Sequence, residues 1–417
     1  MLGLGTVGSA VAERLTRSPR LMAKLIGTEI RLHRVAVRDP AKHRPVELPA
    51  EVLTTDPDEV VNDPEVDVVV EVMGGLEPAR QMIQASLQGG KSVVTANKAV
   101  IARDGPALAG TATGNAGLWF EAAVGGAVPI ISLLRHALLA DRIGEVRGVV
   151  NGTTNFILGE MQNSGSTLEA AVAEAQRRGY AEADPSGDID GDDAADKLAI
   201  LVWLAFGVRL DQASIPREGI RALQGRDVRY ASLLDSTVKL VASASLTAGS
   251  LTARVAPTLV PLEHPLAAPQ GAENTITVTG DLSGPAALRG MGAGGRPTAS
   301  AILSDLVAAC QAHLSRTTPT ALPQANPAPL LSDEEAETAG YLRIIPSNEA
   351  EAPQLVVQAL EDRGIPIEAS VSEDAQLLVL TRAAPRATLD RALETLDSIP
   401  AVESVACRLD RIEAASS

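Results

Sequence analysis

Apolar positions along the first third of the chain follow two spacings. Four short apolar runs predict strands that are buried on both faces, as in a parallel sheet: residues 33–38, 66–72, 91–95 and 118–121. Amphipathic stretches of helical spacing lie between them, at residues 9–17 and 78–87. Strands separated by helix-length segments indicate a doubly wound α/β domain, which we expect to occupy residues 1–127.

The middle of the chain, residues 128–311, has a different pattern. Helical periodicity is strong at residues 128–140 and 193–206. Three later segments alternate like antiparallel strands: residues 236–246, 251–259 and 273–279. A glycine-rich turn then precedes a helical stretch at 297–310. We therefore predict an α+β domain in which residues 290–311 pack back on the first domain.

The last part of the chain predicts a small separate domain. Residues 312–337 are rich in proline, threonine and alanine and then acidic, which is typical of a linker. Residues 338–412 give the order βαββαβ, from segments at 341–345, 352–362, 366–372, 377–381, 387–399 and 402–409. We expect this tail to be dispensable for the chemistry of the protein.

Composition restricts the class of function. The 417 residues allow two or three domains, and 45% hydrophobic with 21% charged residues is typical of a soluble globular protein. A net charge of −16 argues against nucleic acid or an anionic membrane as a partner. The five histidines lack the spacing of a zinc or iron site. Cys310 and Cys407 lie far apart, and no export signal opens the chain, so we expect a reduced, cytoplasmic setting.

The first motif that carries chemistry is a GxGxxG loop before a helix. It comprises Gly3, Gly5, Thr6, Val7 and Gly8. Such a loop lets the backbone approach a pyrophosphate and aims a helix N-terminus at it, as in a Rossmann-type dinucleotide-binding domain. Taken alone, the pattern also fits an ordinary glycine-rich turn.

The end of the next strand indicates a coenzyme preference. It ends at Arg38 and Asp39, where the adenosine ribose of a dinucleotide lies in this fold. An arginine there can accept a 2′-phosphate, whereas an aspartate can bind a 2′-hydroxyl. We expect NADP, with NAD tolerated, although Arg38 could also be a solvated strand end.

The start of the chain is short for such a loop. Only Met1 and Leu2 precede Gly3, whereas a strand has roughly five or six residues. We expect the N-terminal strand to be truncated here and the natural protein to begin upstream.

Two further strand ends carry polar groups. Residues 71–75 (EVMGG) follow one predicted strand, and Asn97 and Lys98 follow the next. Ligands of open α/β sheets bind at the carboxyl ends of the strands, so Asn97 and Lys98 could reach a nicotinamide or a substrate oxygen. A helix N-cap followed by an exposed lysine is the competing interpretation.

The segment at residues 179–198 (GYAEADPSGDIDGDDAADKL) holds seven carboxylates and one lysine. It lacks the ligand spacing and the closing glutamate of an EF-hand calcium loop. Asp193 and Lys197 are four residues apart, so they share one helical face. Carboxylates are also what a substrate ammonium group needs, while a set of surface salt bridges is the alternative. The chain has six lysines against thirty arginines, which makes Lys98 and Lys197 conspicuous.

Together these motifs resemble the homoserine dehydrogenase family, over nearly the whole chain. The matching motifs are residues 95–99 (TANKA), 120–129 (FEAAVGGAVP), 150–155 (VNGTTN), 179–198 and 290–301 (GMGAGGRPTASA). The resemblance implies an NAD(P)-dependent oxidoreductase that interconverts L-homoserine and L-aspartate 4-semialdehyde in threonine, methionine and isoleucine biosynthesis. It also implies that the α+β domain binds substrate and forms a homodimer or homotetramer.

The resemblance further implies a role for individual residues. Lys197 matches the catalytic lysine of the family and Asp193 the aspartate beside it. Glu182 matches the residue that binds the substrate amino group, and the same pocket is lined by Asp184 and Asp188. Lys98 matches a lysine near the nicotinamide and the substrate. Backbone positions near the dinucleotide are matched by Gly179 and Gly292. A sodium site is matched by Glu121 with the carbonyls of Val124, Gly126 and Val128.

The tail is similar to an ACT domain, a βαββαβ module that often binds amino acids, and this implies threonine as an effector. Residues 347–353 (SNEAEAP) lack the glycine that the module usually has at its first strand–helix turn. Two rivals stay open: another Rossmann oxidoreductase on an amino-acid-derived carbonyl, and a non-catalytic amino-acid sensor. A lysine ammonium can supply a proton or positive charge to an aldehyde oxygen, which favours the enzyme.

Overall fold

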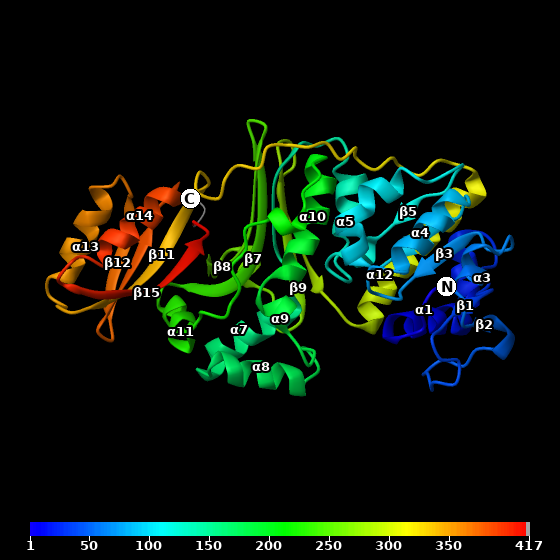
Figure 1. Ribbon diagram of the computed structural model, residues 1–417, viewed down its shortest axis with the longest axis horizontal. Coiled ribbons are helices and arrows are strands. Elements are labelled where there is room, and N and C mark those ends of the chain that lie inside the picture. The colour runs from blue at the N-terminus through cyan, green and yellow to red at the C-terminus, as the bar shows by residue number, and fades with distance from the viewer. Residues whose placement is uncertain (414–417) are drawn as a thin grey trace. The chain divides into compact units, whose positions relative to one another are not determined.

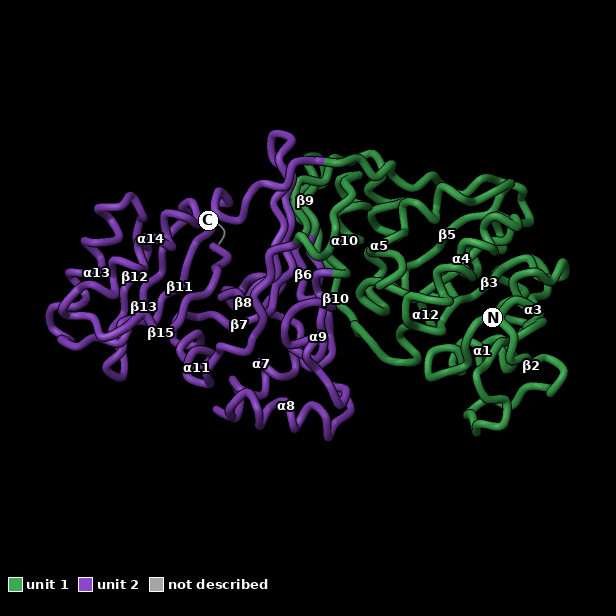
Figure 2. The backbone as a smooth tube through the Cα atoms, viewed as in Figure 1, with its two compact units in different colours: residues 1–146, 196–214, 278–327 green, residues 147–195, 215–277, 328–417 purple. Residues whose placement is uncertain are grey.

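The computed structural model describes residues 1–413 and divides into two compact units (Figure 2). Unit 1 comprises Met1–Val146, Asp196–Ser214 and Val278–Pro327, and unit 2 comprises Arg147–Ala195, Ile215–Thr277 and Ala328–Ser417. The expected domain at residues 128–311 therefore contributes to both units. The boundaries of this expected domain differ from those of the units, because each unit is made of segments that lie far apart in the sequence.

Unit 1 contains the predicted α/β domain. Its parallel strands are β1 (Val35–Ala36), β2 (Leu53–Thr54), β3 (Val68–Glu71), β4 (Ser92–Thr95) and β5 (Leu118–Trp119). Leu2 forms parallel bridges to both Ala36 and Glu71, so it stands between β1 and β3. The resulting order, β2-β1-Leu2-β3-β4-β5, is that of a dinucleotide-binding sheet and confirms the predicted fold class.

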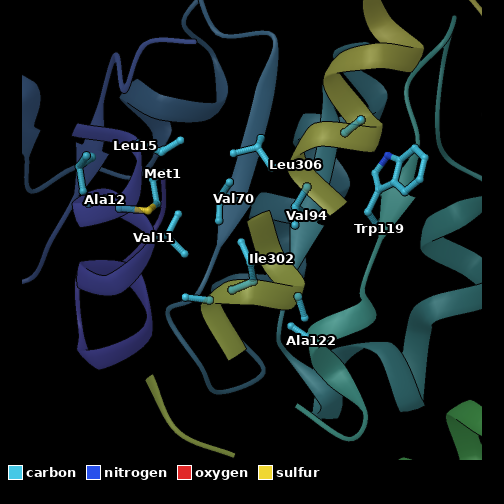
Figure 3. Close-up of a cluster of buried hydrophobic side chains, with 14 of the residues drawn as sticks. Met1, Val11, Ala12, Leu15, Val70, Val94, Trp119, Ala122, Ile302 and Leu306 are labelled. Carbon is cyan, nitrogen blue, oxygen red and sulfur yellow. The ribbon is translucent and has the colours of Figure 1, made fainter. Parts of the chain in front are cut away.

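Helices cover this sheet. They are α1 (Thr6–Arg17), α2 (Pro19–Ile26), α3 (Asp58–Val61), α4 (Ala79–Gln88), α5 (Lys98–Ala109) and α12 (Gly295–Ser315) (Figure 1). Ile302 and Leu306 of α12 share a buried core with Val70, Val94 and Trp119 (Figure 3). α12 is distant in sequence from the strands, yet it closes one face of their sheet.

The helix expected at residues 128–140 is much shorter. α6 (Ile130–Ser132) passes at once into a π-helical turn, η3 (Leu133–Ala137). In this turn Leu138 donates its N–H to the carbonyl of Leu133 over 2.9 Å. The wider turn carries Arg135 inward, where its guanidinium lies 5.2 Å from the ring centre of Trp119. Helical periodicity does not distinguish such a turn from an α-helix.

The α+β part of unit 2 is built on long strands. β7 (Ser236–Thr247) and β8 (Ser250–Pro261) form a hairpin in register throughout. The flanking helices are α7 (Gly152–Ser164), α8 (Leu168–Arg177), α9 (Ser186–Ile189) and α11 (Gly225–Leu233). Three elements cross the boundary between the units along the chain: β6 (Ile143–Val149), β9 (Glu273–Gly280) and α10 (Asp192–Phe206). A fourth, β10 (Gly284–Met291), belongs to unit 1. The remaining short turns of 3-10 helix are η1 (Ala50–Val52), η2 (Glu121–Ala123), η4 (Gln212–Ser214) and η5 (Pro265–Ala267).

The tail has the predicted βαββαβ order. Its elements are β11 (Glu337–Pro346), α13 (Ala352–Glu361), β12 (Ile367–Glu373), β13 (Gln376–Thr381), α14 (Arg386–Leu396) and β15 (Val402–Arg411), with the two-residue β14 (Ala384–Pro385) paired to β11. Its sheet is antiparallel in the order β15-β11-β13-β12. The two helices pack a separate apolar core against it.

The tail also pairs with the rest of unit 2. β15 pairs in parallel with β8 through Asp410 and Arg411, so the two sheets are continuous. Ile412 shares a buried cluster with Val241 and Val260 of the hairpin. Hydrogen bonds across strands and a shared apolar cluster cost free energy to break, so the tail is part of unit 2.

The expected linker is also docked rather than free. α12 extends to Ser315, and the extended segment after it is held by hydrogen bonds to unit 1. Trp203 donates its indole N–H to the carbonyl of Pro323 over 2.9 Å, and the backbone of Asn326 pairs with Gly207 and Arg209. Prolines predict an extended segment, whereas its docking depends on distant partners. Over residues 1–413, none of the helices has the length and apolar character that crossing a bilayer requires.

Candidate active site

The glycine loop has the geometry that a dinucleotide requires. Gly3 has φ +102°, and a Cβ on it would lie 2.7 Å from the carbonyl oxygen of Val72. A Cβ on Gly8 would lie 2.5 Å from the carbonyl oxygen of Gly3. A Cβ on Gly5, by contrast, would meet nothing within 4 Å among residues 1–413. The outer glycines are therefore required by the chain itself, and the middle one leaves the backbone open to a ligand.

Two helix N-termini converge beside this loop. α1 begins at Thr6 and α12 at Gly295, and a Cβ on Gly295 would lie 2.8 Å from the Cγ2 atom of Thr6. Their N-cap residues, Gly5 and Gly294, have no side chain that could cap the first N–H groups. Two positive helix ends favour a pyrophosphate at this place. Val7, in the first turn of α1, packs on the apolar core, so only its backbone can serve the ligand.

Gly292 lies on the segment that leads to α12. A Cβ on Gly126 would lie 2.5 Å from the carbonyl oxygen of Gly292, and Ala127 donates its N–H to the carbonyl of Met291 over 3.0 Å. The structure therefore brings Gly292 against the turn at residues 125–127. Only glycine fits at position 126, because its φ is also positive.

The loop after β1 carries the predicted coenzyme-selecting residues, and both Arg38 and Asp39 are exposed. Sequence reasoning missed Arg44, which ties this loop to the glycine loop. Its guanidinium donates to the carbonyls of Leu4 (3.2 Å), Lys42 (2.8 Å) and Asp39 (2.8 Å). An arginine in a polar loop gives no local signal of such a role, because its partner at Leu4 is forty residues away.

The ends of β3 and β4 meet, as predicted. Glu71 is fully buried and accepts hydrogen bonds from the hydroxyl of Thr95 (2.6 Å) and the N–H of Met73 (2.8 Å). Burial raises the pKa of Glu71, and these hydrogen bonds oppose the rise. Asn97 uses its side chain as the N-cap of α5 and as a donor to the carbonyl of Gly75 (2.8 Å). Asn97 thus has the capping role of the competing interpretation, and Lys98 follows it as the half-buried first residue of α5.

Glu121, the carboxylate of the expected cation site, caps α6. Its two oxygens accept the N–H of Ile131 (2.9 Å), the N–H of Ser132 (2.7 Å) and the Ser132 hydroxyl. Burial raises its pKa, and these hydrogen bonds oppose the rise. The carbonyl of Val128 accepts the N–H of Ile130 over 2.8 Å. A cation could therefore use only lone pairs that remain, although a carboxylate and carbonyls in a glycine turn are oxygen donors that suit a hard cation.

Asp305 of α12 is a buried neighbour of Glu121 that the sequence pattern did not indicate. Its carboxylate accepts the N–H of Glu121 over 2.7 Å. Burial, together with the nearby charge of Glu121, raises the pKa of Asp305 to about 7, while this hydrogen bond and Arg135 oppose the rise. Within residues 1–413 no three His, Cys, Asp or Glu side chains gather as metal ligands.

The structure separates six of the seven carboxylates of residues 179–198 by their partners and exposure. Asp190 pairs with Arg221 over 2.8 Å, and Asp192 pairs with Arg217 over 2.8 Å. These two form the surface salt bridges of the alternative interpretation. Asp184 accepts the N–H of Ser186 over 3.1 Å, which with the Ser186 hydroxyl lowers its pKa. Glu182 is exposed, three residues after Gly179, whose φ is +75°.

Two other carboxylates of this segment meet on one residue. Asn151 donates from Nδ2 to Asp188 (2.6 Å) and to Asp193 (2.8 Å). Asp193 lies in the first turn of α10, and Lys197 follows one turn later on the same helix, with both side chains half-buried. Sequence reasoning noted the motif that contains Asn151 and gave this residue no role.

Comparison with known proteins decides the family. The family model described as homoserine dehydrogenase matches residues 129–307, and the model of the homoserine dehydrogenase NAD-binding domain matches residues 3–119. A homoserine dehydrogenase of Synechocystis is 47% identical over 74% of this chain and 72% of its own length. The chain belongs to the homoserine dehydrogenase family.

Solved structures of family members show the same architecture. The homoserine dehydrogenase of Thiobacillus denitrificans superposes with a TM-score of 0.90 at 39% identity, over 99% of this chain and 97% of its own. A hyperthermophilic archaeal homoserine dehydrogenase in complex with NADPH superposes with a TM-score of 0.61 at 32% identity, over 74% of this chain and 95% of its own. As a family member, the chain is an NAD(P)-dependent oxidoreductase that acts on a CH–OH group.

Proposed function

We propose that this chain interconverts L-homoserine and L-aspartate 4-semialdehyde with NADP as its preferred coenzyme. Family membership supports the reaction. The NADPH bound to the archaeal relative supports the coenzyme, and so does Arg38 beside the braced loop at residues 39–44. NAD remains a usable coenzyme because Asp39 can bind a 2′-hydroxyl.

The residues of unit 1 fit a dinucleotide. Gly3, Gly5, Thr6, Val7 and Gly8 hold its pyrophosphate through their backbone and the N-terminus of α1. Further backbone contacts to it come from Gly179 and Gly292. Asn97 keeps the loops after β3 and β4 in place for the nicotinamide end, since its amide joins both. The bound coenzyme supplies or removes the hydride.

The reacting oxygen is served by Lys197. Its ammonium donates a proton to the aldehyde oxygen during reduction and takes it back during oxidation, because a lysine amine, unlike a guanidinium, can lose its proton. Asp193, one turn earlier on α10, orients Lys197. Glu182 binds the substrate ammonium group, and Asp184, Asp188 and Lys98 complete the recognition of the amino acid.

Further assignments go with this function. Glu121 and the carbonyls of Val124, Gly126 and Val128 would hold a sodium ion, through lone pairs that the α6 cap leaves. The protein acts as a homodimer or homotetramer in the cytoplasm.

Threonine acts as an effector through the tail, but it does not bind at residues 347–353. The N–H groups of Ser347 and Asn348 in that turn already donate to the carbonyl of Ala401.

One observation supports the catalytic assignment most strongly. Of the carboxylates at residues 179–198, Asp188 and Asp193 are held by a buried amide, whereas Asp190 and Asp192 pair with surface arginines. A carboxylate that is fixed beside the only lysine of the segment is suited to orient it. The decisive residue is therefore Lys197.

The test is the substitution Lys197→Arg, which keeps the positive charge and removes an amine that can release its proton. We expect kcat for NADPH-dependent reduction of aspartate semialdehyde to fall by about 10²-fold or more, with the Kd for NADPH unchanged. Asp193→Ala should lower kcat less than Lys197→Arg does, because Lys197 remains as the proton donor. Lys24→Arg, an exposed lysine on α2, is the matched control. If Lys197→Arg turns over within about threefold of the wild type, Lys98 becomes the leading proton donor.

A further inference from the structure

The side chain of Asn151 makes four hydrogen bonds at the N-terminus of α7. Its Oδ1 accepts the N–H of Thr154 (2.8 Å) and the Thr154 hydroxyl (3.0 Å), so Asn151 is the N-cap of the helix. Its Nδ2 donates to Asp188 (2.6 Å) and to Asp193 (2.8 Å). The residue is only 3% exposed. All of the hydrogens of its amide are therefore used on two carboxylates.

Few side chains could do this. The N–H of Thr154 is a donor only, which fixes the orientation of the amide and turns its NH₂ group toward the carboxylates. An aspartate would cap the helix equally well but has no donor. A serine would also cap it, but its one hydroxyl cannot serve two carboxylates and the cap together. The position requires an acceptor on one side and two donors on the other.

Asn151 is itself held in place from the opposite side. Asn274 donates its amide to the carbonyl of Val150 over 3.1 Å. One turn into α7, the side chain of Asn155 accepts a hydrogen bond from the ammonium of buried Lys239 (2.6 Å). It also donates a hydrogen bond to the carbonyl of Gly271 (2.9 Å). The loop that contains Gly271 and the first residues of β9 thereby hold the start of the helix, so the donors of Asn151 have a fixed position.

We propose that Asn151 is the positioning residue of the active site: it holds Asp188 and Asp193 side by side. This inference rests on the proposed function, in which Asp193 orients Lys197. Two carboxylates that share one nitrogen repel each other, so a donor between them is needed to keep them this close. The two hydrogen bonds from Nδ2 offset the repulsion. Asn151 thus fixes the position from which Asp193 can pair with an ammonium.

Two substitutions separate loss of the donors from a change of charge. Asn151→Ser keeps a helix cap and removes both donors, and Asn151→Asp keeps the cap and adds a third negative charge. We expect kcat to fall by about 10- to 100-fold in both, with the Kd for NADPH unchanged, because the residues that hold NADPH in the proposed function lie largely in unit 1.

A double-mutant cycle shows whether Asn151 acts through Asp193. In the Asp193→Ala background, Asn151→Ser should lose less than about threefold in kcat, since the group that it positions is gone. Asn163→Asp, an exposed asparagine on the same helix, is the control and should leave kcat unchanged.

The proposal is overturned if kcat in Asn151→Ser lies within about threefold of the wild type. It is also overturned if the increases in activation free energy caused by Asn151→Ser and by Asp193→Ala are fully additive in the double variant. A lower melting temperature with unchanged kcat would show a helix cap only, and it also overturns the proposal. If neither Asn151 variant folds, Asn151→Gln decides: it keeps the amide and moves it by one methylene, so kcat should still fall by about 10-fold or more, and a kcat within about threefold of the wild type refutes the role. The proposed function fails separately, through an active Lys197→Arg.

Discussion

The buried ion pair between Arg343 and Asp227 should make the tail essential for the stability of unit 2. Arg343 of β11 donates from Nε to Asp227 of α11 over 2.6 Å, and both side chains are 1% exposed. Arg343 also donates to Gln376 over 2.9 Å, and the other oxygen of Asp227 accepts the N–H of Gln224 over 2.7 Å. The pair joins the tail to the α+β part of the unit.

The substitution Arg343→Met tests this pair. It keeps an apolar stem but leaves the Asp227 carboxylate buried without its counter-charge. Removing one partner of a buried pair costs about 3–5 kcal/mol, and screening by water does not reduce this because neither group is exposed. The double substitution Arg343→Met with Asp227→Asn removes the stranded charge and keeps an acceptor for Gln224. It should recover at least about 1.5 kcal/mol of that loss.

The chain offers a matched control that also joins α11 to the tail. Arg229 of α11 pairs with Asp374, in the turn between β12 and β13 of the tail, over 2.5 Å, with side chains 61% and 55% exposed. Arg229→Met should therefore cost less than about 1 kcal/mol.

The assay is denaturant unfolding followed by far-UV circular dichroism and by tryptophan fluorescence. Trp119 and Trp203 both lie in unit 1, so tryptophan fluorescence reports on unit 1. If the units unfold separately, the loss in free energy of unfolding caused by Arg343→Met should be larger when it is measured by circular dichroism. The reasoning is refuted if Arg343→Met lowers the free energy of unfolding by no more than Arg229→Met does. It is also refuted if a chain that ends near Pro323 has the same free energy of unfolding as the full chain.

Two further predictions follow from unit 1. Arg44→Ala should weaken NADP binding by about 5- to 10-fold and NAD binding less, because the loop that carries Arg38 loses its tie to Leu4; equal losses for both coenzymes, measured by titration, would contradict this. The pKa of Asp305 is raised to about 7, so the folded state binds its proton more tightly than the unfolded state, and the free energy of unfolding should fall as pH rises from about 4 to about 7. Asp305→Asn should remove that fall, which is about 4 kcal/mol at about 1.4 kcal/mol per pH unit. The free energy of unfolding, measured at pH 4, 5, 6, 7 and 8, would count against this if it depended on pH in Asp305→Asn as it does in the wild type.

The pattern of the sequence predicted the elements well where one face or both faces are buried. The glycine loop before α1, the apolar strands β3 and β4, and the βαββαβ order of the tail were all predicted from local spacing. The helix expected at residues 193–206 differs from α10 by one residue. Motifs also indicated the family, because loops that bind a dinucleotide need glycine at fixed spacing, whatever the rest of the chain does.

The pattern failed where the outcome depended on a distant partner. Residues 128–140 have helical periodicity, yet Glu121 starts a short helix there and Arg135 lies inward beside Trp119 in a π turn. The tail looked independent because its own core is complete, while its pairing with β8 involves residues about 150 positions away. Composition similarly described residues 312–337 as a linker and could not show what holds them.

The same division applies to the active site. The sequence alone determined which chemical groups are available: a glycine loop, a lysine on a helix, and seven carboxylates before it. Tertiary structure decided which of these carboxylates are held for chemistry and which are neutralised at the surface. Asp190 is paired by Arg221, 31 residues away, whereas Asp188 and Asp193 are held by Asn151, 37 and 42 residues away. Local pattern reports the burial and backbone preference of a residue, but the partner of a charged side chain is set by which segments the fold brings within hydrogen-bonding distance.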